Sequence, residues 1–276
     1  MAEPSRYIHG HAESVLRSHR WRTADNSAGY LLAHLRPGIR ILDVGCGPGT
    51  ITLDLARLIA PTPVVGLDPV EAPLAAARAD AAAAGVDNVT YQTGDVTALA
   101  FGDGSFDVVH AHQVLQHLTD PVAALREMGR VCRDDGVVAA RDADYAAMTW
   151  FPADPRLDRW RDLYRQVARA GGGEPDAGRR LLAWARAAGF GHVEPSASVW
   201  CFATPDDRAW WGETWAERVR TSTFGHQALE GALATESELD DLAEAWLAWT
   251  ACDDAWFAVL HGEILCRREA PATVAM

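Results

Sequence analysis

Residues 40–50, Arg-Ile-Leu-Asp-Val-Gly-Cys-Gly-Pro-Gly-Thr, decide the fold that this chain is expected to adopt. The apolar run 40–45 is rich in strand-forming residues and predicts a buried strand, and residues 51–59 place apolar side chains at helical spacing. Glycines at 45, 47 and 49 join the two, and glycine lets a backbone approach a ligand that a Cβ would exclude. The order of strand, glycine-rich turn and helix predicts an α/β sheet with a ligand at the turn.

The alternation of strand and helix continues beyond this turn. It predicts helices at 71–85 and 121–133, and strands at 64–68, 89–95, 106–113 and 136–145. Such regular alternation is typical of a parallel sheet with helices on both faces. With two late strands at 192–203 and 256–266, we expect a Rossmann-like, doubly wound sheet of seven mostly parallel strands.

The later part of the chain predicts a helical cap. Helices are expected at 155–170 and 176–188, and a helical block at 204–250 lies between the two late strands. Thr204 before Pro205 predicts one helix start, and Thr235 with Glu238 predicts a capping box at another. We therefore expect a single domain, 1–276, with these parts: an N-terminal helical lid at 1–36, a core at 37–203 and 251–269, and a Trp-rich helical cap at 204–250.

Composition limits the classes of partner. The 276 residues carry a formal charge of −13, and all 25 basic residues are Arg. Nucleic-acid binding needs a basic face, so the acidic balance argues against it. No apolar run reaches the roughly 18 residues of a membrane span, and no secretory signal is present. Five scattered Cys without a CxxC pair predict neither disulfides nor a metal site. These features predict a cytoplasmic protein.

Two acidic residues end the second and third predicted strands. Asp68, before Pro69, can accept hydrogen bonds from two ribose hydroxyls, although an Asp before Pro also starts turns. Asp95 can accept from an adenine amine, although alone it is typical of a loop cap. Together with the glycine-rich turn, the two predict a nucleoside site along the strand ends. A dinucleotide fingerprint needs glycine at position 50, which is Thr, so a dehydrogenase is disfavoured.

These stretches resemble the motifs of class I S-adenosylmethionine-dependent methyltransferases, nearest to the UbiE-like small-molecule group. The resemblance covers about residues 37–145 and rests on ILDVGCGPGT (41–50), VVGLDP (64–69), TGDV (93–96) and FDVVHAHQVLQHLTDP (106–121). It implies S-adenosylmethionine as cofactor and S-adenosylhomocysteine as product. The implied contacts are Asp43, Gly45, Cys46, Gly47 and Gly49 at the methionine part, Asp68 and Pro69 at the ribose, Asp95 and Val96 at the adenine, and His112 and Gln113 beside the methionine and the sulfur.

The N-terminal segment carries a second resemblance. Tyr7-Ile8-His9-Gly10, followed by Arg22-Thr23-Ala24, looks like the entry segment of glycine N-methyltransferase-like enzymes. That resemblance implies that Tyr7 approaches the sulfonium and that Arg22 holds the methionine carboxylate, a pairing that suits a guanidinium. The alternative is a surface helix with scattered Arg.

Methyl transfer needs in-line positioning of a nucleophile, and it needs a base only when that nucleophile must lose a proton. The catalytic candidates are His117, Asp144 and Tyr7. His117 lies one place after the catalytic His of plant-type O-methyltransferases, and the alternative is a His packed at a helix start. Asp142 and Asp144 share one face of a strand, and the alternative for them is solvated loop acids. His9, His11 and His261 are further options.

Eleven Trp indicate the acceptor. Seven of them lie in or beside the predicted cap: Trp200, Trp210, Trp211, Trp215, Trp246, Trp249 and Trp256. Most are expected to pack the cap on the sheet, but an aromatic pocket also suits an apolar ring or an isoprenoid chain. The expected substrate contacts are Tyr145, Trp150, Trp211 and Trp215.

We therefore expect methyl transfer to a hydrophobic small molecule, aromatic or isoprenoid-containing. The resemblance to UbiE-like enzymes points to secondary metabolism. The alternative is a methyltransferase-fold protein that binds the cofactor and has a regulatory rather than catalytic role. The sequence leaves open O-, N- or C-methylation and the formation of a homo-oligomer.

Overall fold

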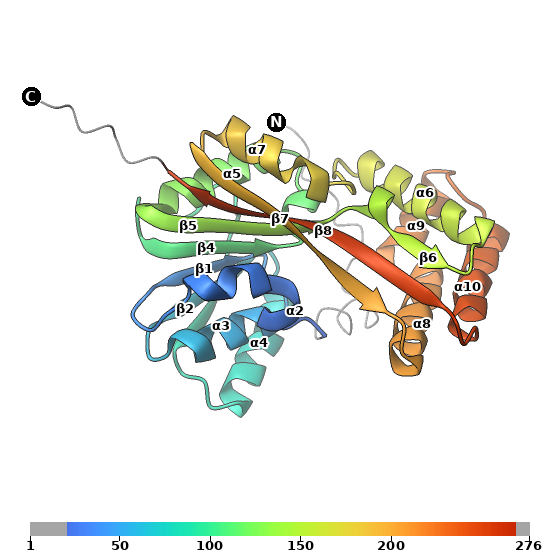
Figure 1. Cartoon of the computed structure of the whole chain (residues 1–276), viewed down its shortest axis with the longest axis horizontal. Helices are drawn as coiled ribbons and strands as arrows, with labels where there is room; N and C mark the ends of the chain where they lie inside the picture. Colours follow the sequence, from blue (N-terminus) through green and yellow to red (C-terminus); the bar gives the residue numbers. More distant parts are fainter. Residues whose placement is uncertain (1–20, 269–276) are drawn as a thin grey trace, which may run out of the picture.

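The computed structural model describes residues 21–268, which form one twisted sheet between helices and a helical region beside it (Figure 1). The strand order is β3-β2-β1-β4-β5-β8-β6, with β7 paired to the other edge of β8. Five strands are parallel to one another: β1 (Ile41–Val44), β2 (Val64–Asp68), β3 (Val89–Thr93), β4 (Phe106–His112) and β5 (Cys132–Ala143). β8 (Trp256–Arg267) runs antiparallel between β5 and β7 (His192–Phe202). The predicted Rossmann-like sheet is confirmed, and the three-residue strand β6 (Thr149–Phe151) adds an eighth member.

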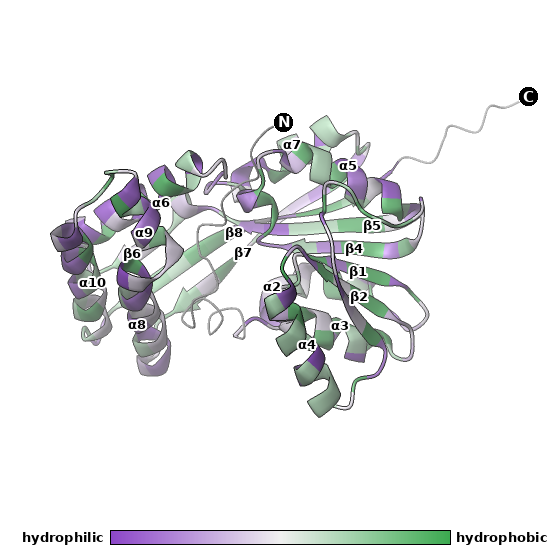
Figure 2. Ribbon diagram, turned by 180° about the vertical axis from the view of Figure 1, so that it is seen from behind, coloured by the Kyte–Doolittle hydropathy of each residue, from purple (hydrophilic) through white to green (hydrophobic). Residues whose placement is uncertain are grey.

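Helices cover both faces of the sheet. On one face lie α2 (Ala24–Ala28), the 3₁₀ helix η1 (Gly29–His34), α3 (Thr50–Ile59) and α4 (Glu71–Ala83); on the other lie α5 (Pro121–Val131) and α7 (Leu181–Ala188). Figure 2 shows apolar residues on the central strands and hydrophilic residues on outward helix surfaces. Burying both faces in this way explains why the parallel strands are nearly continuous apolar runs.

The helical region is built on the far ends of β7 and β8, which reach beyond the other strands (Figure 1). It contains α6 (Pro155–Ala170), α8 (Pro205–Thr221), α9 (Thr223–Glu230) and α10 (Glu236–Thr250). Its centre holds fully buried Trp160, Trp215 and Trp246, whose rings meet edge to face or stacked, and Phe257 of β8 joins them. α6, which the sequence places in the core, shares this apolar cluster with the helices of the predicted cap. The division into lid, core and cap stays a prediction.

Several local signals behave as the sequence predicts, with two corrections. Thr204 and Asp207 form a reciprocal capping box at the start of α8. At α10, Thr235 accepts from the Glu238 backbone, but the predicted box is not completed, because the Glu238 carboxylate instead accepts from Arg159 of α6 at 2.7 Å. β5 starts at Cys132 rather than at 136, since Cys132 is already paired with Phe106 of β4.

Short 3₁₀ helices follow two of the strands, with η2 (Leu115–His117) after β4 and η3 (Tyr145–Ala147) after β5, and η4 (Gly178–Arg180) leads into α7. Tyr7, His9, His11 and most of the predicted lid lie outside the described residues. Within 21–268, no helix combines the length and apolar character that crossing a membrane requires.

Candidate cofactor and acceptor sites

A cavity of about 680 Å³ lies at the carboxyl ends of β1, β2, β3 and β4, and we call it the cofactor cavity. Its volume is in the range of small-molecule sites, and its position is where open α/β sheets bind ligands. The sequence-predicted residues that line it are Arg22, Asp43, Gly45, Cys46, Gly47, Asp68, Pro69, Asp95, Val96, His112, Gln113 and His117. The chain thus brings together residues that are up to 95 positions apart. All of them except Arg22, which precedes α2, lie at or just after the ends of neighbouring parallel strands.

The glycine-rich turn after β1 is shaped by left-handed backbone. Gly45 and Gly47 have φ of +65° and +53°, a region that L-residues with a Cβ rarely adopt. A Cβ at Gly45 would lie 2.3 Å from Cγ2 of Val114, which also lines the cavity. Gly49 is different, since it does not line the cavity, and its Cβ would lie 2.8 Å from Ala77 of α4. Gly49 therefore allows α3 and α4 to approach each other.

Asp68 joins the second strand to the glycine-rich turn. Its Oδ2 accepts from the Gly47 backbone N–H at 2.9 Å, and its Oδ1 accepts from the Val70 N–H at 3.0 Å. A carboxylate has about four acceptor sites, so these two bonds use part of its capacity. The turn role and the ribose role that the sequence left as alternatives are therefore compatible in one side chain.

Asp95 caps its own loop, and Asp43 makes hydrogen bonds with two side chains. Asp95 is exposed at the cavity, and its Oδ1 accepts from both the N–H and the hydroxyl of Thr97 at 2.8 Å, so it does cap its loop. Asp43 is buried, with Oδ2 accepting from the Thr52 hydroxyl at 2.6 Å and Oδ1 at 2.7 Å from Nδ1 of His110. Sequence reasoning missed His110, although its place two residues before the end of β4 puts it beside β1.

His112 is buried at the floor of the cofactor cavity. Neither ring nitrogen of His112 has a hydrogen-bond partner among the described residues. Burial lowers the pKa of His112 well below 6.5, and the nearby Arg22 and Arg141 guanidinium groups lower it further. A neutral imidazole with unsatisfied nitrogens in a ligand-sized cavity fits a bound polar ligand, because buried polar groups are otherwise paired.

Arg22 and Gln113 stand between two cavities. The Arg22 guanidinium donates through Nη2 to Oε1 of Gln113 at 2.7 Å, although the residues are 91 positions apart. Both residues line the cofactor cavity and also a second, smaller pocket. Gln113 has φ of +53°, an unusual value for a residue with a Cβ, and its N–H donates to the Arg141 carbonyl at 2.7 Å.

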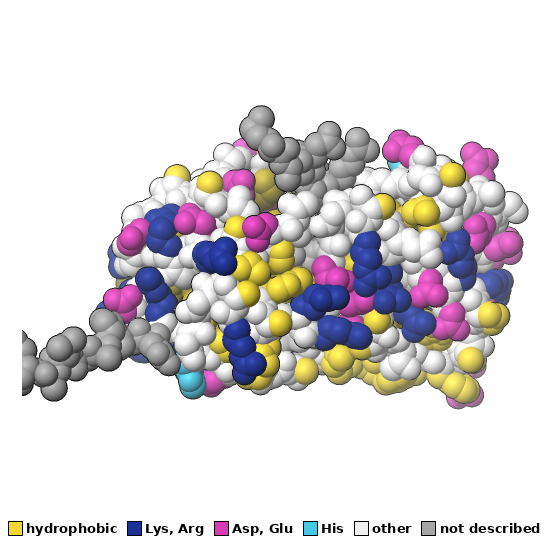
Figure 3. All heavy atoms as spheres, turned by 90° about the horizontal axis from the view of Figure 1, so that it is seen from above, with side chains coloured by type: hydrophobic (Ala, Val, Ile, Leu, Met, Phe, Trp, Pro, Cys, Tyr) yellow, Lys and Arg dark blue, Asp and Glu magenta, His cyan; other side chains and the backbone are white. Residues whose placement is uncertain are grey.

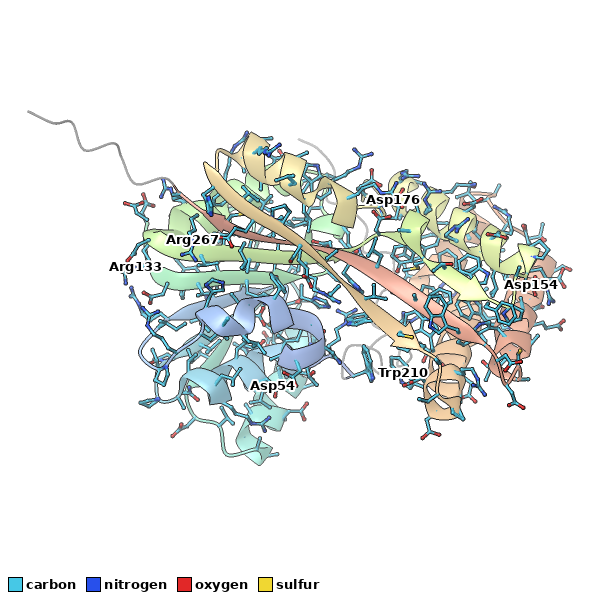
Figure 4. All side chains as sticks on the ribbon, viewed as in Figure 1. Asp54, Arg133, Asp154, Asp176, Trp210 and Arg267 are labelled. Atoms are coloured by element: carbon cyan, nitrogen blue, oxygen red, sulfur yellow. The ribbon has the colours of Figure 1, made fainter. Side chains whose placement is uncertain are left out.

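The second pocket, of about 20 Å³, is aromatic, and we call it the aromatic pocket. Its rings come from Trp21, Tyr145, Trp200, Trp210, Trp211 and Trp215, with Met148 and Arg218 beside them. Trp210, labelled in Figure 4, extends from α8 toward the sheet and lies 5.3 Å from the Trp21 ring. Three of the four predicted substrate contacts thus line one pocket. Trp150 lines neither cavity, because it stacks on Phe257 and under the Arg161 guanidinium.

The contacts of His117 disfavour its predicted role as a base. Gln116 uses Oε1 to accept from the Ala143 N–H, so its amide NH₂ faces Nε2 of His117 at 3.1 Å and donates to it. Burial lowers the pKa of His117 to about 3. An imidazole with that pKa, and with this lone pair already used, is a poor proton acceptor near neutral pH.

Asp144 does not reach either cavity. Its carboxylate is buried, pairs with the Arg179 guanidinium through both oxygens, and caps η3 by accepting from the Ala147 N–H. These contacts disfavour a catalytic role for Asp144, because its carboxylate is used to pair with Arg179 and to cap η3. The adjacent strand acid, Asp142, is also buried, and its Oδ1 accepts from the Gln116 N–H at 3.1 Å.

The surface over α6 and α7 carries mixed charge. Figure 3 shows arginine and acidic side chains interspersed on this face. Asp176 pairs with Arg165 at 2.8 Å and Arg169 at 2.6 Å, and Glu174 pairs with Arg180 at 2.9 Å. These three arginines are therefore each paired with an acidic neighbour.

Comparison with known proteins identifies the family. A model of the methyltransferase domain matches residues 35–189. The chain is 33% identical to an uncharacterized methyltransferase of Schizosaccharomyces pombe over 95% of this chain and 96% of that protein. It is 28% identical to LtbC of Aspergillus luteorubrus, described as a probable methyltransferase, over 95% of this chain and 97% of that protein. The crystal structure of YcgJ from Bacillus subtilis shares the fold, with a TM-score of 0.57 and 20% identity over 88% of this chain and 98% of that one.

The chain therefore belongs to the class I S-adenosylmethionine-dependent methyltransferases. It is an S-adenosylmethionine-dependent methyltransferase, and its cofactor cavity fits that group: a glycine cradle that a Cβ would fill, carboxylates at successive strand ends, and a buried histidine with unsatisfied nitrogens. Among residues 21–268 no cluster of three or more His, Cys, Asp or Glu could hold a metal ion.

Proposed function

We propose that this methyltransferase acts on a hydrophobic small molecule, with an aromatic ring or an isoprenoid chain, that binds in the aromatic pocket. The observation that carries the proposal is the shared wall: Arg22 and Gln113 line both the cofactor cavity and the aromatic pocket. An acceptor held between the tryptophans would therefore lie next to the methionine end of the cofactor. Indole and phenol faces favour flat or apolar ligands, and they also attract cations.

Bound S-adenosylmethionine supplies an electrophilic methyl group on a sulfonium. We propose that Asp68 and Pro69 hold its ribose, Asp95 and Val96 its adenine, and that the turn at 45–47 with His112, Gln113 and Arg22 holds its methionine end. The support for these roles is that all of the residues line one cavity in the order of the strands. The work of the chain is then positioning and exclusion of water, because neither His117 nor Asp144 is placed to remove a proton.

The volume of the aromatic pocket implies that the acceptor widens it. About 20 Å³ holds no more than a water molecule. The ring of Trp21 fills the neighbouring space, with ring centroids 5.1 to 5.4 Å from those of Trp200, Phe202 and Trp210. These are ring contacts without hydrogen bonds between the side chains, so the rings can separate without leaving a polar group unpaired. We expect acceptor binding to displace Trp21 from this cluster.

The test is methyl transfer from labelled S-adenosylmethionine to a panel of prenylated, phenolic and polar aliphatic acceptors. We expect product with the apolar or aromatic members, and a rise of about tenfold in acceptor KM for Trp211→Leu, because aromatic contacts in a pocket are worth about 1 kcal/mol or more each. Trp150→Leu is the matched control, since Trp150 lies outside both cavities, and its KM should stay near the wild-type value. Transfer only to polar aliphatic acceptors would refute the proposed substrate class. Cofactor binding without transfer to any acceptor would favour the regulatory alternative.

A further inference from the structure

A chain of hydrogen bonds leads from the cofactor cavity into the interior of β8. Arg22 Nη2 donates to Oε1 of Gln113 at 2.7 Å. The Gln113 amide nitrogen lies 2.9 Å from Nε2 of His261, and His261 Nδ1 lies 3.1 Å from the Val259 carbonyl oxygen. Nothing in the family resemblance draws attention to His261, which lies 148 positions from Gln113.

The direction of each bond follows from chemistry. A carbonyl oxygen can only accept, so His261 carries its proton on Nδ1 and donates to Val259. Nε2 of His261 is then the acceptor, and it receives a proton from the Gln113 NH₂ group. This leaves Oε1 of Gln113 facing Arg22, whose guanidinium can only donate. All three bonds therefore require one orientation of the Gln113 amide.

His261 is held rigidly and away from both cavities. Its side chain is fully buried, it lines neither cavity, and the Trp200 ring packs on it with centroids 4.3 Å apart. Burial, with the charges of Arg141 and Arg22, lowers the pKa of His261 well below 6.5, so the ring stays neutral and Nε2 keeps its lone pair. The hydrogen-bonded route from His261 to the cofactor cavity therefore passes through Gln113, and the His261 ring also makes ring contacts with the cavity-lining residues Trp200 and His112.

The backbone of Gln113 supports the same conclusion. Its φ of +53° lies in the left-handed region, which residues other than Gly, Asn and Asp seldom adopt. Strained residues persist where the surroundings over-determine them, and they concentrate at functional sites. Here the strain occurs at the residue whose side chain separates the two cavities.

We propose that His261 is a positioning residue for this methyltransferase. It fixes the amide of Gln113 with its oxygen toward Arg22, and thereby holds the Arg22 guanidinium at the junction of the cofactor cavity and the aromatic pocket. The inference rests on the proposed placement of the methionine end of the cofactor beside Gln113 and Arg22, and it does not depend on the class of acceptor.

The test is calorimetric titration of the full-length chain with S-adenosylhomocysteine. His261→Phe keeps the ring but removes the acceptor, and we expect Kd to rise about tenfold, the effect of one buried hydrogen bond to a charged network. His261→Gln can place an amide oxygen near the position of Nε2, so it should recover part of the loss, to within about threefold of the wild type. The double variant Gln113→Ala with His261→Phe should bind no more weakly than Gln113→Ala alone, because residues that act in series are not additive.

Ser198→Ala is the matched control. Ser198 is paired with His261 in the β7–β8 register, but its hydroxyl contacts Arg141 and Glu263 and not Gln113. We expect it to lower the melting temperature without changing the Kd, whereas a merely structural role for His261 would make both variants behave alike. The proposal is overturned if folded His261→Phe binds within twofold of the wild type, or if its effect adds in full to that of Gln113→Ala. If His261→Phe does not fold, His261→Leu decides, because it also lacks the acceptor: folded His261→Leu that binds more weakly than His261→Gln supports the proposal, and wild-type binding by His261→Leu overturns it.

Discussion

Asp142 offers a stability prediction that follows directly from its surroundings. Its carboxyl group is fully buried on β5, with Oδ1 accepting from the Gln116 N–H and Oδ2 without a hydrogen-bond partner in the described chain. Burial raises the pKa of Asp142 to about 7, and the backbone bond and the charges of Arg141 and Arg22 only partly oppose it. The folded protein therefore keeps this proton at pH values where the unfolded chain, with a pKa near 3.8, has lost it.

The sign and the size of the effect follow from proton linkage. Between the two pKa values the folded state binds more protons, so stability from this group is fully present below about pH 3.8 and is lost as the pH rises toward 7. At about 1.36 kcal/mol per pH unit, the loss between pH 5 and pH 8 is about 2.5 kcal/mol. Asp142→Asn keeps an acceptor for Gln116 and cannot ionise, so it should be free of this loss.

The measurement is urea unfolding of the wild type and Asp142→Asn at pH 5, 6, 7 and 8. We expect the difference in unfolding free energy to move in favour of the variant by about 2.5 kcal/mol from pH 5 to pH 8, with most of the change below pH 7.5. Parallel pH profiles for the two proteins would refute the reasoning, because they would mean that Asp142 ionises at the same pH in the folded and unfolded states.

Three further predictions test the site and the cap. Gly45→Ala and Gly38→Ala both place a Cβ at positive φ, which should lower the unfolding free energy of each by about 1–2 kcal/mol. Only the Cβ at position 45 meets another side chain, so only Gly45→Ala should also weaken S-adenosylhomocysteine binding in a calorimetric titration. Asp144→Asn removes the charge of a buried carboxylate that pairs with half-exposed Arg179, and it should lower the melting temperature while kcat stays within about twofold of the wild type; a loss of kcat at full stability would restore a catalytic role. Trp246→Ala should lower the unfolding free energy by about 3–5 kcal/mol, because Trp246 is fully buried. Trp256 is exposed, so Trp256→Ala should change the unfolding free energy by about 1 kcal/mol or less. Equal losses in urea unfolding would contradict the buried centre assigned to the cap.

The cofactor side of this protein could be predicted from the sequence because its information is local. A strand followed by a glycine-rich turn fixes the position of Gly45 and Gly47, and parallel strands place Asp68 and Asp95 at the same edge of the sheet. The order of strands and helices along the chain is then enough to predict how the parallel strands are arranged in the sheet. Gly49 is the exception among the glycines, since its lack of a Cβ allows the approach of α4 and the residue does not line the cavity.

The acceptor side could not be predicted in the same way because it depends on long-range packing. Trp150 and Trp211 look alike in the sequence, but β6 pairs with β8 and stacks Trp150 on Phe257, away from the pocket. His117 and His261 also look alike as candidate bases. The tautomer of His117 is set by Gln116, whose amide is oriented by the Ala143 backbone. The tautomer of His261 is set by the Val259 carbonyl, which lies on the same strand.

The most direct test of the central claim is calorimetric titration of S-adenosylhomocysteine into the wild type and into Asp68→Ala, with circular dichroism to show that both are folded. We expect that the wild type binds and that Asp68→Ala binds at least about tenfold more weakly, since it loses charge-assisted hydrogen bonds to the ribose and the carboxylate that holds the Gly47 turn. Absence of binding by the folded wild type, or equal binding by the two proteins, would contradict the assignment of the cavity at the ends of β1 to β4 as the cofactor site.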